Sequence, residues 1–475
     1  MFVDREQELA FLKRISTCQR PGPAQLILLY GRRRIGKTEL LLHWSQQSGI
    51  PTTYWTAEKE PAALQRRKLF AALTAMPLQY TPIFVSWAEL WDAAAQIIGD
   101  QRRVLVLDEL PYAMESDPAT LSALQHAWDR AFQHMRTIII LCGSQIRVME
   151  LLQAAQSPLF GRLTGQWYLQ PLPFSALKAF FPTSSVEERI AVFALVGGVP
   201  AYLGWLDPSL TFAENVHQVV LDPGSLFSAE PTLLIYDEVR EPQPHLAILK
   251  AIGAGAHTLD EISNATLIGK THLSSYLVRL KDLKLIERRL PATLASAERL
   301  RSRKGRYHLR DPYFRFYFRF LAPAHEQAGL SPDQIWSRIQ QDLRAFIGQT
   351  AFEDLAREWV RGQGQAGRLP FAPEVIGSHW SRHVQADVVA VNWRERAILI
   401  GECKWSTERV DRQIVRDLIE TKTPLILRDL PDQGQSWAVT YACFARGGFT
   451  DAARQLMDAH QGVCVDLDRL DRDLP

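Results

Sequence analysis

Residues 25–40 read QLILLYGRRRIGKTEL, an apolar run followed by a glycine-rich turn and an amphipathic segment. Within this stretch, Gly31–Thr38 matches the pattern G-x-x-x-x-G-K-[ST] at every fixed position. The glycines let successive backbone N–H groups turn around phosphate oxygens, and a helix that begins at Lys37 points the positive end of its dipole at them. The stretch therefore predicts a strand, a phosphate-binding loop and a helix, and the alternative is a plain glycine turn.

Within this loop each residue type has a chemical reason for its position. Lys37 would reach the β- and γ-phosphates of ATP, and the hydroxyl of Thr38 would take one position on Mg²⁺. The residues expected to contact the nucleotide here are Gly31, Arg32, Arg33, Arg34, Ile35, Gly36, Lys37, Thr38 and Glu39. We expect at least one of the arginines to form an ion pair with a neighbouring segment, because unpaired cations would repel Lys37.

Length and composition limit the classes of protein to consider. A chain of 475 residues is too long for one core and suggests about three domains. The net charge of +2 means that affinity for nucleic acid would have to come from local basic patches. Five cysteines without a C-x-x-C pair argue against a disulfide framework and favour a reducing cytoplasm. The sequence contains no run of about twenty apolar residues, so we expect no membrane-spanning helix.

A second apolar run, at 103–110 (RVLVLDEL), ends in two carboxylates. A buried parallel strand has this pattern, and ligand-binding groups lie at the carboxyl ends of such strands. Asp108 would hold Mg²⁺ directly or through water, and Glu109 would orient or deprotonate the attacking water. The alternative is that both acids belong to a solvated turn.

Two further segments offer groups for the γ-phosphate. The run 137–144 (TIIILCGS) is a third buried-strand pattern that ends at Ser144, which would either sense the γ-phosphate or cap the next helix. Arg162, in PLFGR, could reach the γ-phosphate in its own chain or in a neighbouring copy, or be an ordinary surface arginine. The intermolecular arrangement would require a homo-oligomer.

These motifs occur in a fixed order: FVDREQEL, GRRRIGKT, LVLDEL, LCGS, PLFGR and GGVPAYL. The set resembles the archaeal-type ATPase family of the AAA-related and STAND NTPases over about residues 1–235. The resemblance implies an α/β fold, a P-loop NTPase parallel sheet with a helical lid, and ATP as the nucleotide. It also implies that Pro200, in the Gly-x-Pro element 198–200, contacts the nucleotide; the alternative is a helix-breaking turn.

The pattern changes after residue 241 to short helices followed by two strands. Helices are expected at 245–252, 258–263 and 270–283, and strands at 285–290 and 305–309. This order predicts a winged helix-turn-helix that would bind DNA, with the helix from Lys270 in the major groove. The wing is rich in positive charge suited to phosphate contacts: Arg288, Arg289, Arg299, Arg301, Arg303, Lys304 and Arg306. The alternative is that this domain only packs on the ATPase.

The segment 311–320 (DPYFRFYFRF) alternates basic and aromatic residues. Such a pattern is compatible with bases stacking on the aromatic rings. Aromatic residues at this density more often form a core that joins two domains, which is the interpretation we favour.

Acidic residues and a lysine recur near the C-terminus. Asp387 heads the apolar run in VQADVVAV, and Glu402 and Lys404 end the run in AILIGECKW. Side chains alternate along a strand, so Glu402 and Lys404 share a face, and an adjacent antiparallel strand would bring Asp387 to it. Two carboxylates there could hold Mg²⁺, and the lysine could position or deprotonate water for attack on a phosphodiester.

Order and spacing in this region resemble the PD-(D/E)xK nuclease superfamily, and in particular the domain of unknown function that follows this ATPase module. The resemblance covers about residue 349 to the C-terminus and implies a restriction-endonuclease-like α/β domain. It adds Glu353, on an amphipathic helix, as a third metal ligand. Gln413 matches a common glutamine of these nucleases, whereas Ala386 stands where the motif has proline. The alternative is an inert nuclease-like fold in which Glu402 and Lys404 form a structural ion pair.

Together these patterns predict an ATPase core at 1–165, a helical lid at 166–240, a winged helix at 241–325 and a nuclease-like domain at 335–475. One hypothesis is an enzyme that couples hydrolysis of Mg-ATP to DNA binding and metal-dependent DNA cleavage. The other is an ATP-switched DNA-binding regulator or scaffold whose nuclease-like domain is inactive.

Overall fold

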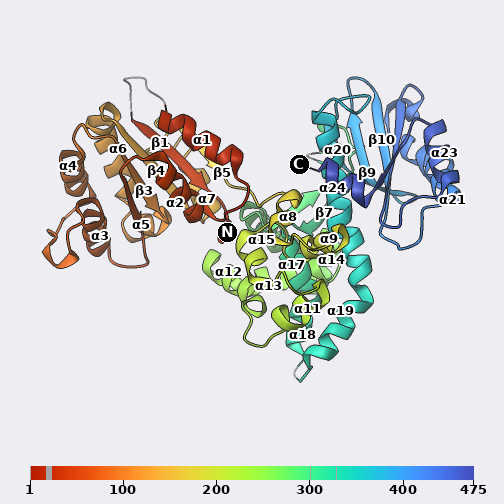
Figure 1. The fold of residues 1–475 in the computed structure, drawn as a ribbon, viewed down its shortest axis with the longest axis horizontal. Coiled ribbons are helices and arrows are strands. Elements are labelled where there is room, and N and C mark those ends of the chain that lie inside the picture. The colour runs from red at the N-terminus through yellow and green to blue at the C-terminus, as the bar shows by residue number, and fades with distance from the viewer. Residues whose placement is uncertain (1, 18–23, 300, 328, 475) are drawn as a thin grey trace. The chain divides into compact units, whose positions relative to one another are not determined.

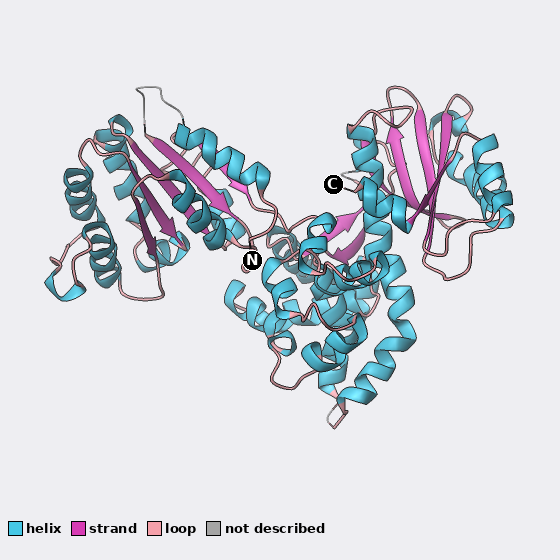
Figure 2. Cartoon of the chain, in the orientation of Figure 1, coloured by secondary structure: helices cyan, strands magenta, loops and turns pink. Residues whose placement is uncertain are grey.

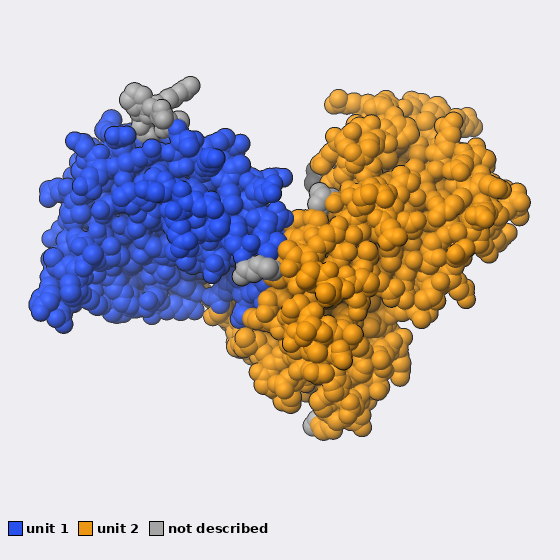
Figure 3. Space-filling view, viewed as in Figure 1, with its two compact units in different colours: residues 1–172, 199–201 blue, residues 173–198, 202–475 orange. Residues whose placement is uncertain are grey.

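The chain forms two compact units in a computed structural model that describes residues 2–17, 24–299, 301–327 and 329–474 (Figures 1 and 3). The first unit comprises residues 1–172 together with 199–201. The second comprises 173–198 and 202–475. None of the helices within the described ranges has the length and apolar character needed to cross a membrane.

A parallel sheet of strand order β2-β3-β4-β1-β5 forms the centre of the first unit (Figure 2). Its strands are β1 (Gln25–Tyr30), β2 (Thr52–Thr56), β3 (Arg103–Asp108), β4 (Thr137–Gly143) and β5 (Gly165–Tyr168). Its helices are α1 (Glu6–Thr17), α2 (Lys37–Ser48), α3 (Ala62–Thr74), α4 (Trp87–Ile98), α5 (Leu110–Ser116), α6 (Thr120–Arg130) and α7 (Ile146–Leu151). Strands β1, β3 and β4 are apolar and buried almost throughout, as expected of parallel strands with both faces covered.

Strand β5 extends this sheet beyond residue 165, where the sequence pattern placed the end of the core. It pairs in parallel with β1, with Ile27 opposite Gly165 and Tyr30 opposite Tyr168. Its sequence, GQWY, is only partly buried, so it carries no apolar run that would reveal a strand. The sheet edge therefore depends on pairing with β1 rather than on a local pattern.

The second unit begins with a helical segment and continues into a helix-and-hairpin module. The helical segment contains α8 (Leu177–Phe180), α9 (Val186–Val196), α10 (Pro200–Trp205, whose first two residues belong to the first unit), α11 (Phe212–Asn215) and α12 (Glu230–Glu238). The module, residues 242–309, contains α13 (Pro242–Gly253), α14 (Leu259–Thr266), α15 (Lys270–Asp282), β6 (Ile286–Arg289), α16 (Ser296–Arg299) and β7 (Arg306–Leu309). Strands β6 and β7 pair antiparallel, so the expected order of helices followed by a hairpin is present.

Buried aromatic rings fill the next segment, α17 (Pro312–Phe316) and the π-helix η6 (Tyr317–Leu321). The hydroxyl of Tyr313 donates to the carbonyl of Phe227, and the two rings lie 5.3 Å apart. Phe314 and Phe316 are fully buried. These rings form a core and are not available for stacking on bases.

A mixed sheet of strand order β12-β11-β10-β9-β8 forms the C-terminal part of the second unit. Its strands are β8 (Val375–Trp380), β9 (Gln385–Asn392), β10 (Ala397–Lys404), β11 (Ala438–Ala445) and β12 (Val463–Asp466). The helices of this part are α18 (Ala322–Glu326), α19 (Pro332–Ile347), α20 (Glu353–Gln365), α21 (Arg412–Arg416), α22 (Thr423–Leu427), α23 (Asp451–Ala459) and α24 (Leu467–Asp473). Strands β8, β9 and β10 are antiparallel neighbours, and β10, β11 and β12 run parallel.

The connection between β6 and β7 docks on this C-terminal sheet. The N–H of Ala292 donates to the carbonyl of Ser378 at 2.9 Å, and the Thr293 hydroxyl lies 2.8 Å from Nδ1 of His379 in a buried contact. The indole N–H of Trp380 donates to the carbonyl of Lys304 at 3.1 Å. The hairpin of the module is therefore packed against β8.

Candidate functional sites

Both fixed glycines of the glycine-rich loop stand where a larger residue would be strained. Gly36 has φ of 90°, in the left-handed region, and a Cβ at Gly31 would lie 2.7 Å from the carbonyl oxygen of Leu169. Lys37 is buried, and its ammonium donates to the carbonyls of Gly31 at 3.0 Å and Arg32 at 3.2 Å. Helix α2 begins without a side-chain cap, so its first N–H groups have no side-chain acceptor and suit an anion.

Arg5 supports this loop from the N-terminal segment. It is buried, and its guanidinium donates to the carbonyls of Ile35 at 3.0 Å and Gln170 at 2.7 Å and pairs with Glu8 at 3.1 Å. Phe2 stacks on His43 of α2 with ring centroids 4.0 Å apart. Sequence reasoning assigned no role to Arg5, because nothing local in FVDREQEL indicates that an arginine there reaches a loop thirty residues away.

The arginines inside the loop have partners of their own. Arg33 donates to the hydroxyl of Tyr112 at 2.5 Å, and Tyr112 belongs to α5, which begins directly after Glu109. The expected ion pair of Arg32, Arg33 or Arg34 with a neighbouring segment stays a prediction. The loop is thus tied to the helix that follows the carboxylates of β3.

Pro200 lies beside the loop. A Cβ built on Gly36 would be 3.9 Å from Cγ of Pro200, and residues 199–201 belong to the first unit. This position agrees with the expected contact between Pro200 and a bound nucleotide, which stays a prediction.

Asp108 and Thr38 lie next to each other at the carboxyl ends of the strands. The Thr38 hydroxyl donates to Oδ2 of Asp108 at 3.1 Å, and Asp108 is buried. The same oxygen accepts from the hydroxyl of Tyr54, and burial together with the Asp108 charge raises the pKa of Tyr54. Tyr54 therefore stays a proton donor to the carboxylate. A hydroxyl and a carboxylate in contact are a donor set that fits Mg²⁺.

Glu109 and Ser144 meet at the same edge. The Glu109 carboxylate accepts from the backbone N–H of Ser144 at 3.1 Å and from its hydroxyl at 2.9 Å. Glu109 has φ of 49°, a conformation that costs a non-glycine residue about 1–3 kcal/mol and is typical of functional sites. The residue that precedes α7 as its cap is Gln145, so Ser144 does not cap that helix.

Arg162 is the predicted nucleotide-site residue that the structure does not bring to the loop. Its guanidinium forms a bidentate pair with Asp129, at 2.7 and 2.6 Å. Nearby, Thr164 bonds to Leu26 at the start of β1, whereas the loop follows the end of β1. In its own chain Arg162 therefore lies toward the end of the sheet where β1 begins, away from the glycine-rich loop at the other end of that strand. A role for Arg162 in a neighbouring copy stays a prediction.

A second constellation lies on β9 and β10. These strands are antiparallel neighbours with Val388 opposite Gly401, and Oδ2 of Asp387 accepts the N–H of Cys403 at 3.0 Å. Glu402 binds Lys404 with one oxygen and Lys422 with the other, both at 2.7 Å. Burial, then the charge of Glu402, raises the pKa of Asp387.

A cavity of about 280 Å³ opens at this constellation. It is lined by Glu402, Lys404, Gln413, Asp417 and Lys422, among others. Gln413 lies on the wall of this cavity, and its role as the glutamine of a nuclease site stays a prediction. Lys422 was missed, because it comes from the π-helix η8 (Asp417–Lys422), whose path no sequence pattern indicates.

Glu353 is paired with an arginine in this structure, and its role as a metal ligand stays a prediction. It accepts a hydrogen bond from Arg357 at 3.2 Å, and the same nitrogen donates to the carbonyl of Asp387 at 2.8 Å. Over the described ranges, no group of three or more His, Cys, Asp or Glu side chains is placed to hold a metal ion. Mg²⁺ is commonly held by one or two carboxylates with water, so Asp387 and Glu402 still fit that ion without Glu353.

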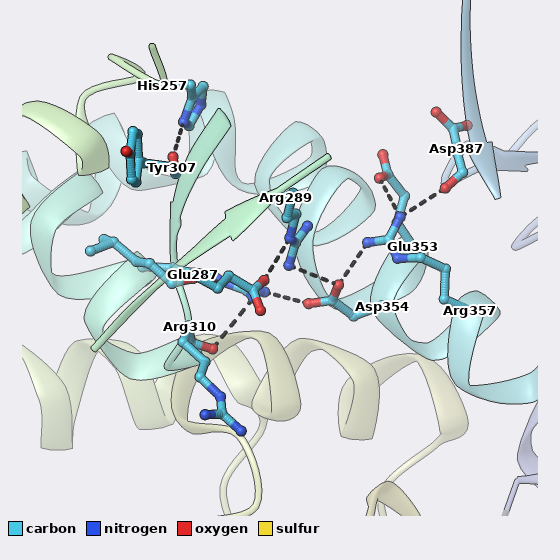
Figure 4. Close-up of polar contacts among 11 residues, drawn as sticks. His257, Glu287, Arg289, Tyr307, Arg310, Glu353, Asp354, Arg357 and Asp387 are labelled. Carbon is cyan, nitrogen blue, oxygen red and sulfur yellow. Dashed lines mark hydrogen bonds and ion pairs between the residues drawn. The ribbon is translucent and has the colours of Figure 1, made fainter. Parts of the chain in front are cut away.

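Asp354 connects this region to the helix-and-hairpin module (Figure 4). Its carboxylate binds Arg289 of β6 at 3.3 Å, Arg315 of α17 at 2.5 Å and Arg357 of α20 at 2.6 Å. Burial alone would raise the pKa of Asp354, but these arginines hold it well below its ordinary value. We call this set the Asp354 cluster.

The first unit has the features of a P-loop nucleotide-binding protein: a parallel sheet, the glycine-rich loop after β1 and a carboxylate at the end of β3. Residues 2–206 match the family model described as an ATPase domain predominantly from Archaea. Residues 317–415 match the model described as archaeal and bacterial proteins of unknown function. An uncharacterized protein of Methanocaldococcus jannaschii is 32% identical over 424 residues, 88% of this chain and 91% of that protein. The chain belongs to this family of archaeal-type ATPases with a C-terminal domain of unknown function.

Other similarities are shorter or weaker. An uncharacterized ATP-binding protein of the same organism is 54% identical over 50 residues, 10% of this chain and 80% of that protein. A Walker-type ATPase of Pyrococcus abyssi has a TM-score of 0.47 and 21% identity, covering 67% of this chain and 96% of its own. The ORC2 protein of Aeropyrum pernix has a TM-score of 0.44 and 14% identity, covering 72% of this chain and 94% of its own. At these TM-scores the two structures add nothing to the assignment.

Glu353 provides a test of the site electrostatics. Burial, then the charge of Asp387, raises the pKa of Glu353 from 4.5 to about 8. Between these two values the folded state keeps a proton that the unfolded state has lost, so this group makes stability fall as pH rises through the window. In Glu353→Gln this contribution is absent. The difference between the melting temperature of the variant and that of the wild type should therefore increase from pH 5 to pH 8.5. The increase should be roughly 2–4 °C for each kcal/mol of unfolding free energy that the wild type loses over this range.

The control for this measurement is Glu408→Gln, at an exposed loop position in the same unit. Its difference from wild type should be the same at each pH. A Glu353→Gln difference that stays constant over the same range would contradict the raised pKa.

Proposed function

We propose that the first unit binds ATP and hydrolyses it with Mg²⁺ at the glycine-rich loop. The observation that carries this proposal is the contact of the Thr38 hydroxyl with the Asp108 carboxylate at 3.1 Å, directly beside the Glu109–Ser144 pair. The helix N-terminus, Lys37 and the ends of β3 and β4 are then arranged around one place. Membership in the ATPase family supports the same nucleotide.

Each residue has a definite task in this proposal. Lys37 exchanges its bonds to the Gly31 and Arg32 carbonyls for the β- and γ-phosphate oxygens. Thr38 and Asp108 would hold Mg²⁺, which when bound neutralises charge on the phosphates. Glu109 leaves Ser144 to orient the attacking water and accept its proton, and Ser144 is then able to donate to the γ-phosphate.

Two substitutions separate binding from hydrolysis. Lys37→Ala should weaken ATP binding by at least tenfold, because it removes a charge-assisted bond worth about 1.5–3 kcal/mol. Glu109→Gln should retain ATP binding and lower the rate of hydrolysis about 10²–10⁴-fold. Calorimetry measures the affinity and phosphate release measures the rate.

Matched controls are Lys13→Ala and Glu115→Gln, both at exposed positions of the same unit. These should leave affinity and rate unchanged. Unchanged turnover in Lys37→Ala, or equal rates for Glu109→Gln and Glu115→Gln, would refute the assignment.

We also propose that the helix-and-hairpin module binds DNA in the manner of a winged helix. Helix α15 presents an exposed polar face that includes Thr271, His272 and Ser275. Internal contacts already engage Arg288 and Arg289. The cations that remain exposed in the connection between the strands are Arg301, Arg303 and Lys304.

Neutralising these three cations together should weaken DNA binding evenly across sequences, because they would contact phosphates and not bases. The slope of log affinity against log salt should become less steep by about 0.9 for each phosphate that the variant no longer neutralises. Fluorescence anisotropy over a salt series measures both quantities. Arg394→Ala, at a side chain that is 93% exposed, is the control. An unchanged slope in the triple variant would show that these three cations do not contact DNA.

A second candidate activity is metal-dependent cleavage of a phosphodiester at the β9–β10 constellation. The observation that favours it is that Glu402 and Lys404 pair at 2.7 Å on the wall of a cavity, while Asp387 accepts the N–H of Cys403, the residue between them. Asp387 and Glu402 would hold Mg²⁺, which when bound supplies charge to the phosphate. Lys404 would position water, and Lys422 offers a further positive charge for the phosphate.

Plasmid nicking with Mg²⁺ or Mn²⁺, with and without ATP, tests this activity. Lys404→Ala and Glu402→Gln should each abolish nicking, while Arg382→Ala, at an exposed position between β8 and β9, should not. Nicking that survives both substitutions would come from elsewhere. An inactive wild type under every metal and nucleotide condition would favour the alternative, an ATP-switched DNA-binding scaffold with an inert nuclease-like domain.

A further inference from the structure

A larger cavity, of about 600 Å³, lies within the second unit where the helix-and-hairpin module faces α19, η7 (Gly348–Phe352) and the C-terminal sheet. Its wall carries four arginines among the described residues, Arg289, Arg306, Arg315 and Arg319. We call it the arginine cleft. It is distinct from the glycine-rich loop and from the cavity at Glu402, and neither proposed activity uses it.

Carboxylates offset part of the charge of these arginines. Asp354 binds Arg289 and Arg315, and Asp342 binds Arg319 at 2.7 Å. Arg306 has no carboxylate within 4 Å in the described part of the chain and lies over the ring of Trp380 at 5.0 Å. Glu353 also lines the cleft, where it accepts a hydrogen bond from Arg357. Positive charge therefore predominates on the wall.

The arginines also keep hydrogen-bond donors available. A guanidinium carries five N–H donors. Arg289 donates from Nε to Glu287 and from one terminal nitrogen to Asp354. Within the described residues, the guanidinium of Arg306 donates no hydrogen bond to the protein. Arg315 is held in place by its pair with Asp354 and by a hydrogen bond from its Nε to the carbonyl of Leu309 at 2.7 Å. Such forks suit the paired oxygens of a phosphate.

An aromatic surface lies beside these donors. The rings of His257 and His308 stack at 4.4 Å, and both residues line the cleft. Burial, then the charge of Arg289, lowers the pKa of His308 to about 2, so this ring is neutral. A neutral flat ring accepts a planar base by stacking. The volume is within the range of small-ligand sites, about 300–1,000 Å³.

We propose that the arginine cleft binds the phosphate of a nucleotide, either free or at the end of a nucleic acid strand. Glu353 lies on its wall, and Arg357, the partner of Glu353, donates to the carbonyl of Asp387. The wall of the cleft is therefore one hydrogen-bonded residue, Arg357, away from the β9–β10 constellation. The inference does not depend on hydrolysis at the glycine-rich loop or on cleavage at Glu402.

The test uses the full chain with Lys37→Ala, so that the glycine-rich loop does not dominate nucleotide binding. Calorimetry compares inorganic phosphate, AMP, a short DNA strand with a 5′-phosphate and the same strand without it. We expect the phosphorylated probes to bind, and Arg306→Ala to weaken them about tenfold. Arg394→Ala, with its 93% exposed side chain, should leave the affinities unchanged.

The probes distinguish the two sources of phosphate. AMP binding as tightly as the phosphorylated strand indicates a free nucleotide, and a preference for the phosphorylated strand over AMP indicates a strand end. Arg306→Lys keeps the charge but loses the fork, so it should also weaken binding, and it serves if the alanine variant does not fold. Equal binding of the two strands together with no binding of AMP or phosphate, or affinities unaffected by Arg306, would overturn the proposal.

Discussion

The parallel ladder that joins β3, β4 and β1 is the constraint on which the nucleotide site depends. Each strand is aligned with its neighbour residue by residue, so Asp108, Gly143 and Tyr30 end at the same edge. As a result Thr38, at the end of the glycine-rich loop, bonds to Asp108, and Ser144 bonds to Glu109, although these residues are far apart in sequence. The apolar runs that form the buried strands therefore also determine where the polar residues of the candidate site lie.

In the second unit the site residues are positioned by an electrostatic contact and by a loop that packs on the C-terminal sheet. The segment between β6 and β7 adds Ala292 to the core beneath the C-terminal sheet, and Asp354 binds arginines from the hairpin, α17 and α20. Together these contacts join the helix-and-hairpin module to the domain that carries Asp387 and Glu402. The cleft lined by Arg306 exists only because these parts meet.

Sequence reasoning succeeded where a local pattern coincides with a local structure. The loop at Gly31–Thr38 and the strand that ends at Asp108 are examples, because periodicity, glycine placement and chain order all indicate the same elements. It failed where a contact depends on the path of the chain. Arg5 reaches the loop, Lys422 reaches Glu402, and β5 joins the sheet without any local signal. The bond from Arg357 to Glu353 is likewise not indicated by any local pattern.

The Asp354 cluster also makes substitutions in this region unequal in their consequences. One half-buried carboxylate compensates Arg289, Arg315 and Arg357 at the same time, so losing it leaves three cations close together without their shared partner, whereas losing one arginine leaves the others paired. A substitution of Asp354 would therefore disturb the hairpin, α17 and α20 at once, although these elements lie in separate stretches of the chain.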